Sequence, residues 1–325
     1  MKILYALQGT GNGHLTRAQK ILPILENYGE LDVFMSGSNT QLKLDNYDVK
    51  QRKGLSLFYN ELGEVSYKKM IKQNSFKSFL NDVNCFPIDD YDLIINDFEP
   101  ITAYSAKKKK KKIIGLSHQA SLLFEETPKV KNKIGEKIIK YYAPTTTHYG
   151  FHFDTYNDSI FLPIIRDKIR VLDAKQEEFY LVYLPSFHPV EIIVCLSSVK
   201  ESNWKVFSPF AKTQSKQFNV EIFPVDEHLF TKKLANCKGV LCGAGFELPA
   251  EAIYLEKKLF VIPIQGQYEQ MCNCEALKNI GVDYSNDLNR DKIQKWVDSS
   301  KVIRKNFPDQ TEEIISQLMI RHNMG

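Results

Sequence analysis

The sequence lacks the patterns that mark several common classes of protein. It contains no apolar run long enough to span a bilayer, and its start shows no basic, apolar leader. Its six cysteines include no Cys-x-x-Cys pair and have no histidines at zinc-binding spacing. We therefore expect a cytoplasmic protein with reduced thiols, and we expect neither a metal site nor another cofactor.

The composition excludes some partners and permits others. Of the 325 residues, 43% are hydrophobic and 25% are charged, with a formal net charge of +4. This is typical of a folded globular protein long enough for two domains. The charge is too small to indicate a nucleic-acid partner, although a basic face would favour peripheral contact with the anionic inner face of a membrane. The lysine run 107–112 is best explained as a solvated helix end, with binding of anionic lipid or nucleic acid as the alternative.

The stretch 239–273 begins with a strand, a glycine turn and a helix start. Residues 240–242 end an apolar strand, and the Gly-Ala-Gly turn at 243–245 lets the backbone approach a ligand closely. Pro249 suits a first helical turn, whose free N–H groups and dipole favour a diphosphate. Glu251 follows about one turn in, where its carboxylate can accept hydrogen bonds from both hydroxyls of a ribose. The pattern predicts a nucleotide site at the end of this strand.

A second glycine loop follows the first strand of the chain. The apolar run 2–7 leads into a loop with glycines at 9, 11 and 13, and residues 15–25 show helical periodicity. The loop lacks the last glycine of the dehydrogenase fingerprint, and the next strand ends in Ser-Gly-Ser, which disfavours a dehydrogenase. His14 falls on the first helical turn, whose positive end keeps an imidazole neutral and able to accept a proton. His14 is therefore a candidate general base; the alternative is a histidine that only orders the loop.

Together, these motifs resemble those of GT-B glycosyltransferases, in particular the UDP-GlcNAc transferase of peptidoglycan assembly and the UDP-glycosyltransferases. The resemblance rests on Gly-Ala-Gly-Phe, Glu-Ala, Val-Ile-Pro and Glu-Gln-x-x-Asn in the second half, and on the glycine loop before His14 in the first. It implies an α/β fold of two doubly wound Rossmann-like domains that face each other across a cleft. The chain departs from the family at Lys258, where the family usually has a proline before the strand.

The resemblance implies a role for several groups of the second half. The glycine turn would hold the donor phosphates, Glu251 the ribose, and the pair Glu269-Gln270 the sugar. The backbone near Val225 would receive a uracil ring, and Ser186 is all that remains of a glycine-serine loop that approaches the phosphates. The expected donor-binding residues are Gly243, Ala244, Gly245, Phe246, Glu251, Glu269, Gln270, Asn273, Ser186 and Val225.

Two polar residues follow strands of the first half. Asp97 ends the apolar strand 91–97, and in UDP-glycosyltransferases an aspartate at such a position pairs with the catalytic histidine, so the resemblance implies a catalytic pair of His14 and Asp97. Asp97 would serve equally well as the N-cap of the following helix. His118 follows the strand 113–116 and is a second candidate for substrate contact. The residues expected at the acceptor or the donor phosphates are Gly11, Asn12, Gly13 and His118.

These motifs also predict how the chain is divided. Residues 1–164 are expected to form the acceptor-side domain and residues 165–308 the nucleotide-sugar-binding domain. Residues 309–325 are expected to form a terminal helix that crosses back to the first domain.

The predicted activity is transfer of a hexose, without a metal, from a UDP-sugar or another nucleotide diphosphate sugar to an acceptor hydroxyl, in cell-envelope or glycolipid glycan synthesis. Helix-start and loop N–H groups would stabilise the departing diphosphate. Retaining relatives carry a second glutamate eight positions before the ribose glutamate, and that position is Gly243 here, which favours inversion. The alternatives are a UDP-sugar epimerase of the same fold and a catalytically silent sugar-nucleotide-binding protein. The acceptor, which could be lipid-linked or a small molecule, is left open.

Overall fold

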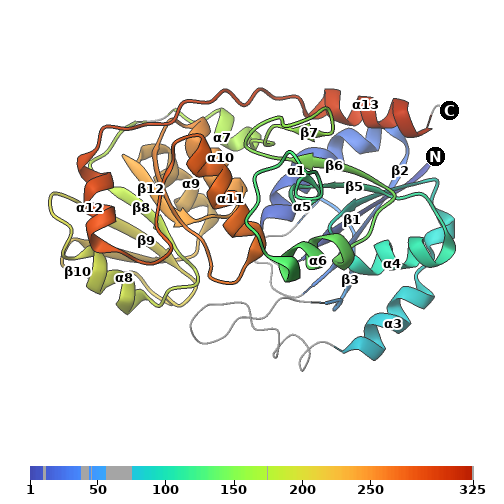
Figure 1. Cartoon of the computed structure of the whole chain (residues 1–325), viewed down its shortest axis with the longest axis horizontal. Coiled ribbons are helices and arrows are strands. Elements are labelled where there is room, and N and C mark those ends of the chain that lie inside the picture. The colour runs from blue at the N-terminus through green and yellow to red at the C-terminus, as the bar shows by residue number, and fades with distance from the viewer. Residues whose placement is uncertain (10–11, 38–43, 45, 56–74, 174, 324–325) are drawn as a thin grey trace.

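The structure contains two seven-stranded sheets, one from each half of the chain (Figure 1). It is a computed structural model that describes residues 1–9, 12–37, 44, 46–55, 75–173 and 175–323. The first sheet has the order β3-β2-β1-β4-β5-β6-β7, and all its strand pairs are parallel. Its strands are β1 (Lys2–Gln8), β2 (Glu30–Ser36), β3 (Val49–Arg52), β4 (Leu93–Asp97), β5 (Ile114–Ser117), β6 (Thr147–Phe151) and β7 (Ile160–Phe161).

The second sheet has the order β10-β11-β9-β8-β12-β13-β14. Its strand pairs are parallel except for the edge strand β10, which runs antiparallel to β11. Its strands are β8 (Tyr180–Tyr183), β9 (Trp204–Ser208), β10 (Ser215–Gln217), β11 (Val220–Pro224), β12 (Gly239–Gly243), β13 (Lys258–Ile262) and β14 (Asp283–Tyr284).

Helices connect the strands and pack on the sheets (Figure 1). In the first half they are α1 (Gly13–Leu25), α3 (Phe76–Cys85), α4 (Pro100–Lys109), α5 (His118–Ser121) and α6 (Lys133–Tyr142). In the second half they are α7 (Asp167–Arg170), α8 (Pro189–Leu196), α9 (Glu227–Asn236), α10 (Glu247–Tyr254), α11 (Tyr268–Asn279), α12 (Arg290–Asp298) and α13 (Thr311–Asn323). The predicted fold class, two doubly wound α/β sheets, is confirmed.

In each sheet the strand order reverses beside the strand that comes first in the chain. β1 lies between β2 and β4, and β8 lies between β9 and β12. The connections on either side of such a point leave to opposite faces of the sheet, so a crevice forms at the carboxyl ends of the strands. α1 begins just after β1 and α10 just after β12, which places both glycine loops at these crevices.

Apolar side chains pack the two sheets together. One cluster of buried residues extends from Tyr5 and Phe151 in the first sheet, through Phe153 and Phe246, to Val240 in the second. Each residue of this series is at most 4% exposed. The face shared by the two halves is therefore held by close packing, which fixes the distance between groups on its two sides.

Helix boundaries differ from the predicted ones where caps decide them. The amphipathic pattern of residues 129–141 predicts a helix there, but α6 starts at Lys133, because the Asn132 side chain accepts hydrogen bonds from the backbone N–H groups of Ile134 and Gly135. A similar pattern predicts a helix over 67–80; part of that range lies outside the described residues, and the described helix α3 runs over Phe76–Cys85. The short strands β10 and β14 were not predicted, since two or three residues carry too little periodicity.

The C-terminal helix α13 returns to the first half of the chain and packs against α1 (Figure 1). Near its end, His322 Nε2 lies 3.0 Å from the hydroxyl of Tyr149 on β6. The domain limits at 164/165 and 308/309 stay predictions. Across the described part of the chain, no helix is long and apolar enough to cross a membrane.

Candidate active site

A cavity of about 680 Å³ lies between the two sheets. Its walls come from the segments that follow β1, β4, β5, β7, β8, β11, β12 and β13, and from α6. These segments leave the carboxyl ends of parallel strands, where open α/β sheets bind ligands. The cavity therefore unites the two crevices at the reversal points of the sheets.

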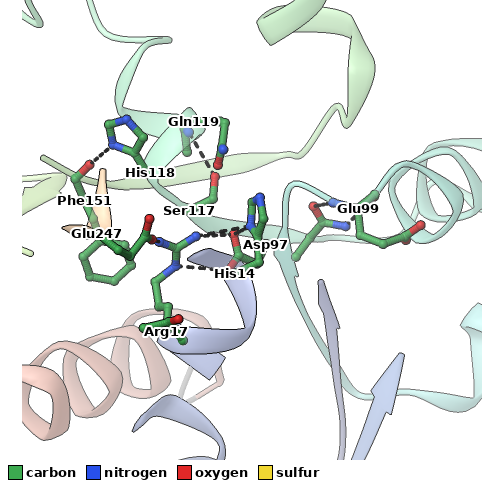
Figure 2. A network of polar contacts seen from close by, with 12 residues as sticks. His14, Arg17, Asp97, Glu99, Ser117, His118, Gln119, Phe151 and Glu247 are labelled. Carbon is green, nitrogen blue, oxygen red and sulfur yellow. Dashed lines mark hydrogen bonds and ion pairs between the residues drawn. The ribbon is translucent and has the colours of Figure 1, made fainter. Parts of the chain in front are cut away.

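His14 and Asp97 form a hydrogen-bonded pair on the first-sheet side of this cavity (Figure 2). Nδ1 of His14 lies 2.8 Å from Oδ1 of Asp97. Asp97 is fully buried at the end of β4, whereas His14 lines the cavity. An ionised carboxylate only accepts hydrogen bonds, so the Nδ1 proton points to Asp97 and Nε2 is the basic nitrogen of the neutral ring.

The alternative role of Asp97 as a helix N-cap is wrong. Glu99 caps α4, with Oε1 accepting from the N–H of Ile101 and Oε2 from that of Thr102, both at 2.7 Å. Between the two acids, Phe98 has a φ of 59°, a conformation that is uncommon without glycine and found at constrained sites. This turn leaves Asp97 free to face α1.

Arg17 holds the same carboxylate and was not singled out from the sequence. Its Nε donates to Oδ2 of Asp97 at 3.0 Å and its Nη2 to Oδ1 at 2.8 Å. Burial by itself would raise the pKa of Asp97, but the charge of Arg17 and the hydrogen bonds from Arg17 and His14 hold that pKa below its ordinary value. A signal was present, because Arg17 follows His14 by three residues and such residues share a helix face.

Arg17 also reaches across to the second half of the chain. Its Nη1 donates to Oε1 of Glu247 at 2.7 Å (Figure 2). Glu247 is the first residue of α10 and lines the cavity. One guanidinium thus contacts carboxylates from both sides of the cleft.

The glycine turn after β12 is placed as expected, although only part of it reaches the cavity. β12 ends at Gly243 and α10 starts at Glu247. Gly245 and Phe246 line the cavity, whereas Gly243 and Ala244 are not among its lining residues. A Cβ added to Gly245 would meet nothing within 4 Å, so this glycine leaves open space beside the helix start.

Glu251 lies on α10 at the cavity wall and is paired with an arginine. Arg166 donates from Nε to Oε1 of Glu251 at 2.6 Å and from Nη2 to Oε2 at 2.8 Å. Its Nη1 donates to Glu227 at 3.0 Å. Arg166 also lines the cavity and is a further site residue that sequence reasoning missed.

Glu269 and Gln270 line the cavity at the start of α11, but Asn273 does not. Asn273 is fully buried; its Nδ2 donates to the carbonyl of Ala244 at 3.1 Å, and its Oδ1 faces Nε2 of His118 at 2.7 Å. The expectation that Asn273 itself binds sugar hydroxyls is therefore replaced by a supporting position behind the glycine turn.

His118 joins the two halves of the site. Its Nδ1 lies 2.8 Å from the carbonyl of Phe151, and its ring stacks on Phe246 with centroids 4.0 Å apart. Because Asn273 donates to Ala244 through Nδ2, its oxygen faces His118, so both ring nitrogens of His118 face acceptors. Glu269 Oε1 lies 3.9 Å from Nε2 on the cavity side.

The other expected residues are divided between the cavity and its surroundings. Val225, which follows β11, lines the cavity, as do Asn12 and Gly13. Ser186 is not a lining residue, whereas its neighbour Pro185 is. Gly11 lies outside the described residues.

The described residues offer no cluster of three or more His, Cys, Asp or Glu side chains that could hold a metal ion. One Asp-x-Asp pattern, the type that holds a cation in many sugar transferases, does occur at Asp90 and Asp92. This pattern precedes β4, whereas Asp97 is the last residue of that strand. The pattern therefore lies at the opposite end of β4 from Asp97. Oδ2 of Asp92 accepts from the backbone N–H of Lys2 at 2.7 Å.

Two facing Rossmann-like sheets with a shared cavity define the GT-B class of glycosyltransferase. The sequence model of glycosyl transferase family 1 matches residues 1–300. The chain belongs to this family, whose members are glycosyltransferases. No functionally curated protein matches the sequence significantly.

Solved structures of the same fold cover nearly the whole chain. MurG of Acinetobacter baumannii has a TM-score of 0.57 at 10% identity over 99% of this chain and 100% of its own. UGT89C1 of Arabidopsis thaliana, complexed with UDP-L-rhamnose, has a TM-score of 0.61 at 11% identity over 99% and 93%. The glycosyltransferase SnogD of Streptomyces nogalater has a TM-score of 0.55 at 11% identity over 99% and 96%. At such low identity these likenesses show the fold alone.

Proposed function

We propose that this enzyme transfers a hexose from a UDP-sugar to an acceptor hydroxyl with inversion and without a metal ion. The donor lies on the second half, with its diphosphate at the start of α10 and its ribose at Glu251. The observation that carries the proposal is that the His14–Asp97 pair faces the same cavity as Gly245 and Glu251. A base and a nucleotide site on opposite walls are what direct transfer requires.

In the proposed mechanism, Nε2 of His14 takes the proton of the acceptor hydroxyl as the oxygen attacks the anomeric carbon. Asp97 orients the ring and stabilises the imidazolium that forms, since its carboxylate is held ionised beside Arg17. The N–H groups at the start of α10 stabilise the departing diphosphate. Glu269 and Gln270 lie where they can bind hydroxyls of the transferred sugar.

The donor class is tested by calorimetry with UDP, GDP and dTDP. We expect UDP to bind best, and Glu251→Ala to weaken it by roughly 1–3 kcal/mol, the usual cost of an unsatisfied buried hydrogen-bonding group. The loss should be smaller for a UDP analogue without ribose hydroxyls, because that ligand has no hydroxyls to donate to the Glu251 carboxylate and its affinity does not depend on this contact. Glu256→Ala is the matched control, since Glu256 is an exposed glutamate that follows the same helix and pairs with Arg304.

If Glu251→Ala lowers the affinity for UDP and for its analogue without ribose hydroxyls equally, Glu251 does not bind the ribose. Binding of GDP or dTDP in place of UDP would change the nucleotide and leave the site in place.

A further inference from the structure

The ion pair between Arg17 and Glu247 connects the proposed base to the proposed donor site (Figure 2). The Arg17 side chain is 3% exposed and that of Glu247 is 23% exposed. Glu247 lines the cavity, whereas Asp97, the other partner of Arg17, is fully buried. The contact with Glu247 is therefore the part of this network that a ligand in the cavity can reach.

The Glu247 carboxylate stands where an anionic ligand would be favoured. It lies at the first turn of α10, near N–H groups that have no partner within the helix. A Cβ added to Gly13 would lie 2.5 Å from Oε2 of Glu247, so the carboxylate also lies against the N-terminal glycine loop. A helix start, a guanidinium and a glycine loop are the groups that bind phosphate oxygens in proteins.

The charged groups of this network already carry an excess of negative charge before a donor binds. Arg17 carries one positive charge, and Asp97 and Glu247 each carry a negative charge. A diphosphate at the start of α10 would add further negative charge next to Glu247, and like charges at such distances repel. Arg17 has five N–H donors and uses three on the two carboxylates, so it can bind a phosphate oxygen without releasing Asp97.

We propose that Glu247 occupies a phosphate position in the donor-free enzyme, and that Arg17 exchanges the Glu247 carboxylate for the donor diphosphate. This inference rests on the proposed function. After the exchange, the guanidinium still holds Asp97 and also neutralises charge on the departing nucleoside diphosphate. Arg17 is then a further catalytic residue, and it links donor occupancy to the orientation of His14.

Calorimetry with UDP, pyrophosphate and uridine tests the exchange. Glu247→Gln keeps the shape of the side chain and removes the competing charge, so UDP and pyrophosphate should bind on the order of tenfold more tightly. Uridine, which has no phosphate, should bind as it does to the wild type. Lys20→Gln is the matched control, because Lys20 lies on α1 and pairs with Asp167 and Asp309 but does not line the cavity.

The role of Arg17 is tested by combining two substitutions. An Arg17→Lys background lacks the guanidinium that would receive the phosphate. In that background, Glu247→Gln should no longer increase the affinity for UDP. Thermal unfolding of each variant checks that it is folded. Should Arg17→Lys fail to fold, the Glu247→Gln measurement decides the proposal alone.

Three results would overturn the exchange. If the wild type binds UDP and Glu247→Gln binds it no more tightly, the proposed exchange is overturned. The proposed function is then unaffected. An equal gain in affinity for uridine in Glu247→Gln would show that the substitution does not act on binding of the phosphates. Absence of both UDP and pyrophosphate binding by the wild type would overturn the exchange together with the donor site.

Discussion

At the scale of single residues, the site depends on the hydrogen bonds that the buried carboxylate of Asp97 accepts. The Asp97 carboxylate accepts hydrogen bonds from His14, from Nε and Nη2 of Arg17 and, at 3.3 Å, from the hydroxyl of Tyr5. A buried carboxylate with this many donors stays ionised, and an ionised carboxylate fixes the tautomer of its histidine. In the proposed mechanism, this geometry prepares Nε2 of His14 for proton transfer before a ligand binds.

Replacement of His14 by alanine should lower turnover on the order of a hundredfold or more, because general base catalysis is lost. Donor affinity should stay within about twofold, since His14 acts on the acceptor. The measurement is release of UDP under saturating donor, beside donor calorimetry. His228→Ala, an exposed histidine on α9, is the control and should behave as the wild type. A collapse of donor affinity with turnover preserved at saturation would make His14 a binding residue.

At the scale of elements, loops of the first half are tied to α11 in the second. His118 at the start of α5 contacts Asn273, and Gln119 donates to Oε2 of Glu269 at 2.9 Å. Through Asn273 the same network reaches the carbonyl of Ala244 in the glycine turn. Buried polar networks of this kind hold their members in one geometry. The turn is thereby supported from the acceptor side of the cleft.

Gly245 gives the element-scale prediction. Its substitution by valine should leave the fold intact, because the added Cβ meets no atom within 4 Å. The side chain would project beside the start of α10 and block the diphosphate, so UDP affinity should fall by on the order of tenfold or more, with a smaller loss for Gly245→Ala. Calorimetry measures the affinity, and thermal unfolding checks the fold. Full UDP affinity in Gly245→Val would place the diphosphate elsewhere.

At the scale of the whole molecule, the two sheets place the proposed base and the proposed donor site on opposite walls of one cavity. His14 comes from the first half, and Gly245 and Glu251 come from the second. Attack from the His14 wall would approach the anomeric carbon from the face away from the diphosphate. Gly243 stands where retaining relatives are expected to carry a glutamate, and a glycine supplies no carboxylate at that position.

We therefore expect an α-linked donor to give a β-linked product. Proton NMR of the first-formed product distinguishes the two outcomes, because a gluco- or galacto-configured β product shows a large anomeric coupling. The acceptor for this experiment is found by screening hydroxyl compounds for release of UDP. An α product would contradict both inversion and the role given to His14.

The sequence by itself determined the main strands, the glycine turns and part of the cavity wall. Apolar runs such as 2–7 and 240–242 predict buried strands, and the glycines after them predict turns, because both signals are local. The same locality placed His14, Gly245, Glu251, Glu269 and Gln270 at strand ends. Those positions face one cavity once the sheets are formed.

Only the tertiary structure decided which of these groups are partners. Asp97 could equally be a helix N-cap or the partner of His14 in the sequence, and the backbone turn at Phe98, which leaves the capping to Glu99, decided between them. The contact of Arg17 with Glu247 joins residues 230 positions apart. Such a pair has no local signature, since its distance is set by how two separately formed sheets pack against each other through Phe151, Phe153 and Phe246.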